Sequence, residues 1–113
     1  MTALVIEDER MIADILEEML IDLGCAAVLR AETLDSALAA VDDHKIDVAL
    51  VDVNLDGVVS YPAAIKLMTR NIPFIFESAV DPALLMPPWN ARPAVQKPFD
   101  FELVEAALKR ALS

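Results

Sequence analysis

The sequence predicts an α/β fold in which a parallel β-sheet is covered by helices on both faces. Short apolar runs alternate along the chain with longer segments in which apolar residues recur every three or four positions. Short continuous apolar runs are typical of strands buried on both faces, and the periodic segments are typical of amphipathic helices. Five such alternations fit within 113 residues, a common size for one domain. We therefore expect a single domain over residues 1–113.

The first half of the chain predicts three strands and two helices. The first strand is expected at residues 3–6, where an apolar run ends in acidic residues, and the first helix at residues 10–23. A second strand is expected at residues 26–29, a helix at residues 33–43 and a third strand at residues 46–51. The apolar face expected for the first helix consists of Met11, Ile12, Ile15, Leu16, Met19, Leu20 and Leu23.

The second half predicts two further strands and two helices, separated by a segment that does not favour a helix. A helix is expected to begin near Pro62, before a fourth strand at residues 74–76. The proline-rich residues 82–93 are the part of the chain that least favours a helix. A fifth strand is expected at residues 94–96 and a last helix at residues 101–112. Its expected inward positions are Leu103, Val104, Ala107, Leu108 and Ala111.

Candidate functional residues follow four of the five expected strands. A sheet of this size commonly takes the flavodoxin-like, doubly wound order 2-1-3-4-5, in which functional groups gather beyond the carboxyl ends of the strands. Those ends carry Glu7 and Asp8, Asp52, Ser78 and Lys97. Each residue alone has an ordinary explanation, such as a helix cap, a turn residue or a surface charge. Their joint occurrence at successive strand ends favours a functional crevice.

The carboxylates of this crevice indicate a magnesium site. Neighbouring carboxylates repel one another, and a divalent cation would remove that repulsion. A set of oxygen ligands without histidine or cysteine favours Mg²⁺, which commonly takes one or two carboxylates and keeps several waters. We expect Asp8 and Asp52 to be direct ligands, together with the backbone carbonyl of Asn54. Glu7 is expected to act through water.

The same residues predict phosphoryl transfer to Asp52. A carboxylate nucleophile of this kind forms an aspartyl phosphate. Catalysis of phosphoryl transfer consists largely of positioning and charge neutralisation. We expect Mg²⁺ to neutralise one phosphoryl oxygen, Lys97 a second, and the hydroxyl of Ser78 a third. The predicted chemistry is thus the domain's own phosphorylation and dephosphorylation, and not turnover of a separate substrate.

Four segments that contain these residues carry a recognisable pattern. They are Val5-Ile6-Glu7-Asp8-Glu9, Leu50-Val51-Asp52-Val53-Asn54-Leu55, Glu77-Ser78-Ala79 and Gln96-Lys97-Pro98-Phe99. They resemble the signature blocks of the response-regulator receiver family, and the resemblance covers nearly the whole chain. It implies a bacterial two-component phosphorelay protein in the cytoplasm that has no output domain of its own. A histidine kinase or a phosphotransfer protein and an effector protein are the implied partners, and the Lys97–Pro98 bond is implied to be cis.

Two positions depart from the usual pattern of that family. Most receivers carry an aromatic residue three positions before the lysine, where this chain has Ala94. Residues 73–80 resemble a stand-alone bacterial subgroup with the motif Pro-Phe-x-Phe-Ala-Thr-Gly-Tyr, which also lacks that aromatic residue. This chain ends the motif with Ser-Ala-Val, so Val80 replaces the tyrosine. We expect Val80 to face water that approaches a phosphoryl group on Asp52 and to affect how long that group survives.

Composition excludes several other classes of protein. The formal net charge of −10 does not suit nonspecific nucleic-acid binding, which needs lysine and arginine. No apolar run approaches the roughly 20 residues of a membrane span, and the first residues lack the basic leader of a signal peptide. Cys25 is the only cysteine, so no disulfide within the chain is possible. Trp89 lies between prolines and is expected to pack locally, with a partner-facing anchor as the alternative.

Two other functions remain open at this stage. The first is a receiver-like protein-binding module that works without phosphorylation, because residues 82–93, Val80 and Ala94 point to altered switching. The second is a small phosphohydrolase of the haloacid type, which would also use an aspartate after a strand. That family has a second aspartate two residues later, where this chain has Asn54. A monomer or a weak homodimer is expected.

Overall fold

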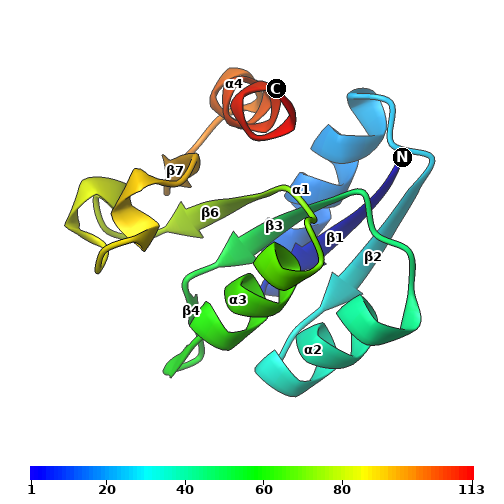
Figure 1. The fold of residues 1–113 in the computed structure, drawn as a ribbon. Helices are drawn as coiled ribbons and strands as arrows, with labels where there is room; N and C mark the ends of the chain where they lie inside the picture. Colours follow the sequence, from blue (N-terminus) through cyan, green and yellow to red (C-terminus); the bar gives the residue numbers. More distant parts are fainter.

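The computed structural model describes residues 1–113 and contains one five-stranded parallel sheet (Figure 1). Its strands are β1 (Thr2–Ile6), β2 (Ala27–Ala31), β3 (Val48–Asp52), β6 (Phe74–Ser78) and β7 (Ala94–Gln96). They lie in the order β2-β1-β3-β6-β7, and every neighbouring pair is parallel. Numbered by their place among these five strands, the order is 2-1-3-4-5. The predicted doubly wound fold is therefore confirmed.

Four helices cover the two faces of this sheet. They are α1 (Arg10–Asp22), α2 (Leu34–Asp43), α3 (Tyr61–Thr69) and α4 (Phe101–Leu112). Helices α1 and α4 lie on one face, and α2 and α3 lie on the other (Figure 1). Successive residues of the central strands enter different cores: Val5 packs on the side of α1 and α4, and Leu4 packs on the side of α2 and α3. Helices cover both faces of the sheet, so consecutive residues of a central strand are all buried. This explains the apolar runs in the sequence.

Local signals begin two of the helices. Thr33 caps α2 through a capping box: its hydroxyl accepts a hydrogen bond from the Ser36 N–H, and the Ser36 hydroxyl accepts one from the Thr33 N–H, both at 3.0 Å. A carboxylate oxygen of Asp100 accepts a hydrogen bond from the Leu103 N–H at 2.9 Å and caps α4. None of the helices combines the length and the apolar composition that crossing a membrane requires.

Residues 82–93 contain no α-helix. They form two single turns of 3₁₀-helix, η1 (Pro82–Leu84) and η2 (Trp89–Ala91). The proline-rich composition explains this, because proline removes a backbone donor and fixes φ. Trp89 fills space over the sheet and is only 8% exposed. Its ring stacks on Tyr61 with centroids 5.2 Å apart and meets Phe76 edge-on at 5.8 Å. The prediction that Trp89 packs locally is confirmed.

Three positions expected inside the protein are exposed. Met11 and Ile15 on α1 are 77% and 46% exposed, and Leu103 on α4 is 52% exposed. The predicted apolar face of α1 was too wide, since the helix contacts the sheet through Ala13, Leu16 and Leu20 at three- and four-residue steps. Ile12, Met19 and Leu23 are partly buried and pack against the same core. The more lateral side chains are left in contact with solvent.

Candidate functional site

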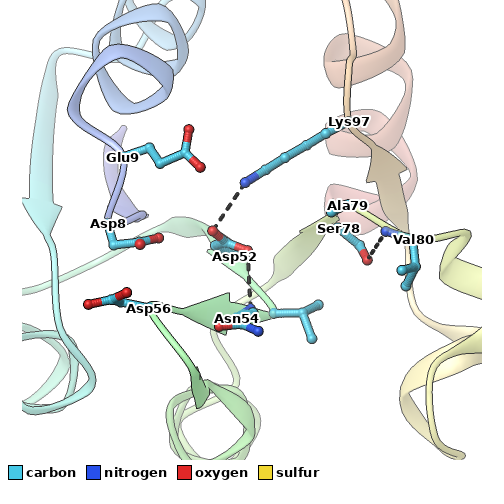
Figure 2. A pocket seen from close by; sticks show the side chains of 10 residues that line it. Asp8, Glu9, Asp52, Asn54, Asp56, Ser78, Ala79, Val80 and Lys97 are labelled. Carbon is cyan, nitrogen blue, oxygen red and sulfur yellow. Dashed lines mark hydrogen bonds and ion pairs between the residues drawn. The ribbon is translucent and has the colours of Figure 1, made fainter.

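An acidic cleft of about 420 Å³ lies at the carboxyl ends of the parallel strands. The loops after β1, β3, β6 and β7 supply most of its lining (Figure 2). The lining residues are Asp8, Glu9, Asp52, Val53, Asn54, Asp56, Ser78, Ala79, Val80 and Lys97. Sequence reasoning placed five side chains at these strand ends, and four of them line this cleft. The fifth, Glu7, lies buried beneath it with 1% exposure.

The Lys97 ammonium joins three carboxyl groups at the base of the cleft. Its Nζ atom lies 3.0 Å from Glu7 Oε1, 3.1 Å from Asp52 Oδ2 and 3.7 Å from Glu77 Oε1. Figure 2 shows the lysine reaching Asp52 from the side of β7, opposite Asp8. Although burial opposes it, contacts with the carboxylates of Glu7 and Asp52 raise the pKa of Lys97 above its ordinary value. The lysine is therefore a fixed positive charge.

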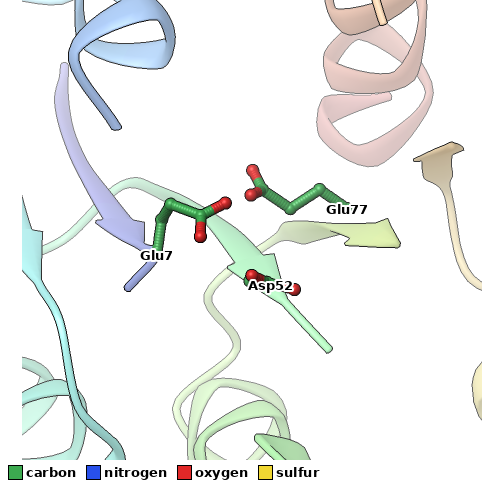
Figure 3. Close-up of side chains that lie close together, drawn as sticks. All are labelled: Glu7, Asp52 and Glu77. Carbon is green, nitrogen blue, oxygen red and sulfur yellow. The ribbon is translucent and has the colours of Figure 1, made fainter. Parts of the chain in front are cut away.

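The register of the sheet explains why these carboxyl groups meet. Asp52 on β3 pairs with Glu77 on β6, and the parallel pairing of β1 with β3 places Glu7 one residue beyond the last pair, Ile6 and Val51. Side chains alternate between the faces, so all three point to the side of α1 and α4. One oxygen of each lies within 4.8 Å of one oxygen of the others (Figure 3).

The environment of Asp52 raises the pKa of its carboxyl group when no cation is bound. Its Oδ1 accepts one hydrogen bond, from the Asn54 N–H at 3.1 Å, and its Oδ2 is paired with Lys97. Burial, with the neighbouring carboxylate of Glu7, raises the pKa of Asp52 to about 7. Burial also raises the pKa of Asp8. A cation in the cleft would stabilise both ionised carboxylates.

Glu7 is held in its ionised form. Burial acts to raise its pKa, but its contacts with Glu77, Asp52, the Glu9 backbone and Lys97 outweigh burial and lower the pKa to about 2. Its Oε2 accepts the Glu9 N–H at 3.0 Å, and its Oε1 accepts from Lys97. Both carboxylate oxygens of Glu7 therefore accept hydrogen bonds from within the protein. This geometry suits Glu7 to orienting the Lys97 ammonium.

The residues of the cleft fit a hard cation. Asp8 and Asp52 offer carboxylate oxygens, and neither histidine nor cysteine lines the cleft. The buried triad of Glu7, Asp52 and Glu77 is a poorer place for an ion, because the Lys97 ammonium already lies between 3.0 and 3.7 Å from an oxygen of each. A cation would therefore bind on the open side of Asp52, toward Asp8.

The remaining predicted residues surround this position. Ser78 is 2% exposed, and its hydroxyl oxygen accepts the Val80 N–H at 3.2 Å, which leaves the hydroxyl proton free to donate. Val80 lines the cleft and is 53% exposed. Ala94 is half-buried against the core that contains Trp89. The Lys97–Pro98 bond is cis, as the resemblance implied.

The predicted set omitted three acidic residues: Glu9 and Asp56, which line the cleft, and the buried Glu77. Asp56 lines the cleft from a hairpin of β4 (Asn54–Leu55) and β5 (Val58–Val59), whose turn residues Asp56 and Gly57 have φ of 51° and 87°. Glu77 is 1% exposed, and neither carboxyl oxygen has a hydrogen-bond partner. Burial, then the contact with Glu7, raises its pKa well above the ordinary value. The sequence shows only a glutamate directly before the last residue of an apolar strand, and its register with Asp52 is visible in the structure.

A doubly wound sheet that ends in an acidic cleft with a paired aspartate and lysine defines the class of α/β receiver domains. Residues 3–109 match the family described as the response regulator receiver domain, and the chain belongs to that family. It is similar over 99% of its length to SdrG from Sphingomonas melonis Fr1, with 39% identity, 96% of that chain covered and a TM-score of 0.88.

Two further solved structures are also similar. PhyR from Brucella abortus is 36% identical over 98% of this chain, with a TM-score of 0.84, and this chain spans 47% of that protein. The receiver domain of PhyR from Erythrobacter litoralis is 31% identical, with 98% and 88% of the two chains covered and a TM-score of 0.79. No curated protein sequence matches the chain at a significant level.

Proposed function

We propose that the domain is a phosphorylation switch in which Asp52 accepts a phosphoryl group beside Mg²⁺. The observation that carries this proposal is the position of Asp52 between the Lys97 ammonium, 3.1 Å away, and an open acidic cleft. Asp52 lines the cleft, its Oδ2 is paired with Lys97, and its Oδ1 accepts a single backbone hydrogen bond, so a lone pair of Oδ1 would remain for a cation or a phosphorus atom. That arrangement suits a nucleophile better than a purely structural ion pair.

The covalent step is an exchange of one bond to phosphorus for another. A carboxylate oxygen of Asp52 bonds to phosphorus while the bond from phosphorus to the donor breaks, and its electron pair leaves with the donor. Asp8, Asp52 and the backbone carbonyl of Asn54 would hold Mg²⁺, with Glu7 next to them through water. Bound there, Mg²⁺ supplies charge neutralisation for the carboxylates and for one phosphoryl oxygen.

Two side chains of the domain would neutralise the other phosphoryl oxygens. Lys97 already points its ammonium at Asp52 and would donate to the second oxygen. Ser78 lies at the end of the neighbouring strand with its hydroxyl proton free, and would donate to the third. Preorganised donors of this kind stabilise charge without having to reorganise during the reaction. Pro98, in its cis peptide bond, connects Lys97 to the loop before α4.

The similar proteins support a role in signalling through partner proteins. SdrG has a structure described as its beryllofluoride-activated conformation, and PhyR from Bartonella quintana is described as an anti-anti-sigma factor. For this chain we propose a histidine kinase or phosphotransfer protein as the phosphoryl donor and an effector protein as the receiver of the signal, in the bacterial cytoplasm. We also propose that the chain belongs to the stand-alone bacterial subgroup. Val80, which replaces the tyrosine of the subgroup motif, is the main departure of this chain from that motif.

Phosphoryl uptake by defined variants tests the proposal. Wild-type protein incubated with labelled acetyl phosphate and Mg²⁺ should take up one phosphoryl group per chain, and Asp52→Asn should take up none. Asp43→Asn is the matched control, because Asp43 is exposed at the end of α2 and outside the cleft. Uptake by Asp52→Asn equal to that of the wild type would overturn the proposal.

One observation favours the alternative of a phosphorylation-independent binding module. The segment between β6 and β7 forms two 3₁₀ turns in place of the helix that a doubly wound fold would place there, and Trp89 anchors it. A segment fixed in this way has less room to respond to phosphorylation. Amide hydrogen exchange over residues 80–95 separates the two functions: beryllofluoride should change it in a switch and leave it unchanged in a constitutive binding module.

A further inference from the structure

Glu77 is the buried acidic residue that the proposed chemistry does not use. It pairs with Asp52 across β3 and β6 and faces the same side of the sheet. Figure 3 shows its carboxyl group pointing toward that of Glu7, above Asp52. Neither oxygen has a hydrogen-bond partner, and Oε1 lies 3.7 Å from Lys97 Nζ, within ion-pair distance but too far for a hydrogen bond.

A group in this situation does not help the fold. A buried polar group without a partner carries its full desolvation penalty, and cores exclude such groups unless they have another use. Destabilising groups of this kind are tolerated mainly at functional sites.

We infer that Glu77 is a positioning residue that retains the Lys97 ammonium in the interior of the resting domain and so weakens its hold on a phosphoryl group at Asp52. The inference rests on the proposed function of Asp52. It assigns to Glu77 a regulatory effect on that site, acting through Lys97, and no contact with the phosphoryl group itself.

The geometry around Nζ is the reason. An ammonium has three N–H donors, and Glu7 and Asp52 accept from two of them. The third is the donor that a phosphoryl oxygen would need, and Glu77 Oε1 is the one further carboxyl oxygen within ion-pair distance of Nζ, at 3.7 Å. That oxygen carries a full or partial negative charge in either protonation state. It therefore attracts the ammonium away from an incoming anion.

Two substitutions at position 77 remove this competition to different degrees. Glu77→Met replaces the carboxyl group with an apolar side chain of similar length. Glu77→Gln keeps the shape and leaves an amide oxygen with a weaker negative charge. Glu18→Gln is the matched control, since Glu18 is exposed on α1 and has no ion pair. Affinity for beryllofluoride in the presence of Mg²⁺, measured by titration with NMR detection, reports on the hold of Lys97.

We expect Glu77→Met to bind beryllofluoride about three- to tenfold more tightly than the wild type. A tenfold change corresponds to about 1.4 kcal/mol of binding free energy. Glu77→Gln should bind about twofold more tightly, and Glu18→Gln should match the wild type. The Lys97 Nζ signal should move in both Glu77 variants and stay unchanged in Glu18→Gln, which repacking of β6 alone would not produce. Should Glu77→Met not fold, Glu77→Gln carries the test.

The outcomes separate the two proposals. Unchanged or weaker binding in the Glu77 variants, beside a wild type that binds beryllofluoride, would overturn the role of Glu77 and leave the proposed function intact. Tighter binding with an unmoved Lys97 signal would also overturn it, because the effect would not act through the lysine. A wild type that binds no beryllofluoride and takes up no phosphoryl group would overturn the proposed function, and the inference with it.

Discussion

Lys97 Nζ lies 3.1 Å from Asp52 Oδ2 although the two residues are separated by 45 positions in the chain. Asp52 ends β3, Lys97 follows β7, and β6 lies between these two strands in the sheet. The lysine therefore crosses the end of β6 to reach the aspartate, and it also passes the buried Glu77. This contact connects the edge strand of the sheet to its centre, and we expect both stability and the proposed chemistry to depend on it.

Removing the lysine should destabilise the domain measurably. Lys97→Met leaves Glu7, which is 1% exposed, and Asp52 without their cationic partner. Breaking a buried pair on one side commonly costs about 3–5 kcal/mol, and the partial exposure of Lys97 lowers our expectation to about 2–3 kcal/mol. Urea unfolding at pH 7 in a chelating buffer measures this. A loss below 0.5 kcal/mol, the usual range for a surface site, would show that the cluster is not stabilised by Lys97.

Stability without a cation should fall as the pH rises from about 4 to about 7. The pKa of Asp52 is raised from 3.8 to about 7, so the folded state binds more protons than the unfolded state in that window. The free energy of unfolding therefore decreases with pH, by at most about 1.4 kcal/mol per pH unit for one group. The raised pKa of Glu77 acts in the same direction. Below pH 4.5 the lowered pKa of Glu7 has the opposite effect, and its contribution is lost toward pH 2.

Unfolding in a chelating buffer at several pH values checks this sign. Asp52→Asn should flatten the decrease, because the amide does not titrate. Added Mg²⁺ should flatten it in the wild type, since a ligand that binds only the folded, ionised form stabilises it by mass action. A wild-type stability that increases steadily from pH 5 to pH 7 in the chelating buffer would contradict the prediction.

Trp89 should contribute more to stability than any other residue between β6 and β7. It is 8% exposed and contacts the rings of both Tyr61 and Phe76. Truncation of a buried aromatic side chain typically costs about 3–5 kcal/mol, so Trp89→Ala should destabilise the domain by about 3 kcal/mol. Met86→Ala in the same segment should change it by less than about 0.5 kcal/mol, because Met86 is 68% exposed. Equal effects of the two substitutions in urea unfolding would contradict this packing.

The sequence predicted the sheet and most of the cleft for one physical reason. Strands buried on both faces are read as apolar runs, and the order of a doubly wound sheet brings their carboxyl ends together. Asp8, Asp52, Ser78 and Lys97 were accessible to that argument. Glu77 was not, because it precedes the strand end by one residue, and only the register with Asp52 shows that it points into the cluster. The exposure of Met11 and Ile15 was missed because an apolar stripe does not reveal how closely a helix approaches the sheet.

Position 80 should control the lifetime of a phosphoryl group on Asp52. Val80 is 53% exposed and lines the open side of the cleft, along the path that water would take to phosphorus. An apolar side chain cannot orient that water, whereas an amide can accept and donate hydrogen bonds. Val80→Gln should therefore shorten the half-life of the aspartyl phosphate about threefold or more, with a stability change within about 0.5 kcal/mol. Val80→Leu, which stays apolar, should leave the half-life unchanged.

The half-lives of the wild type, Val80→Gln and Val80→Leu are measured as decay of the label in a chase after removal of acetyl phosphate. Equal decay rates in all three proteins would show that water reaches the phosphoryl group by another path.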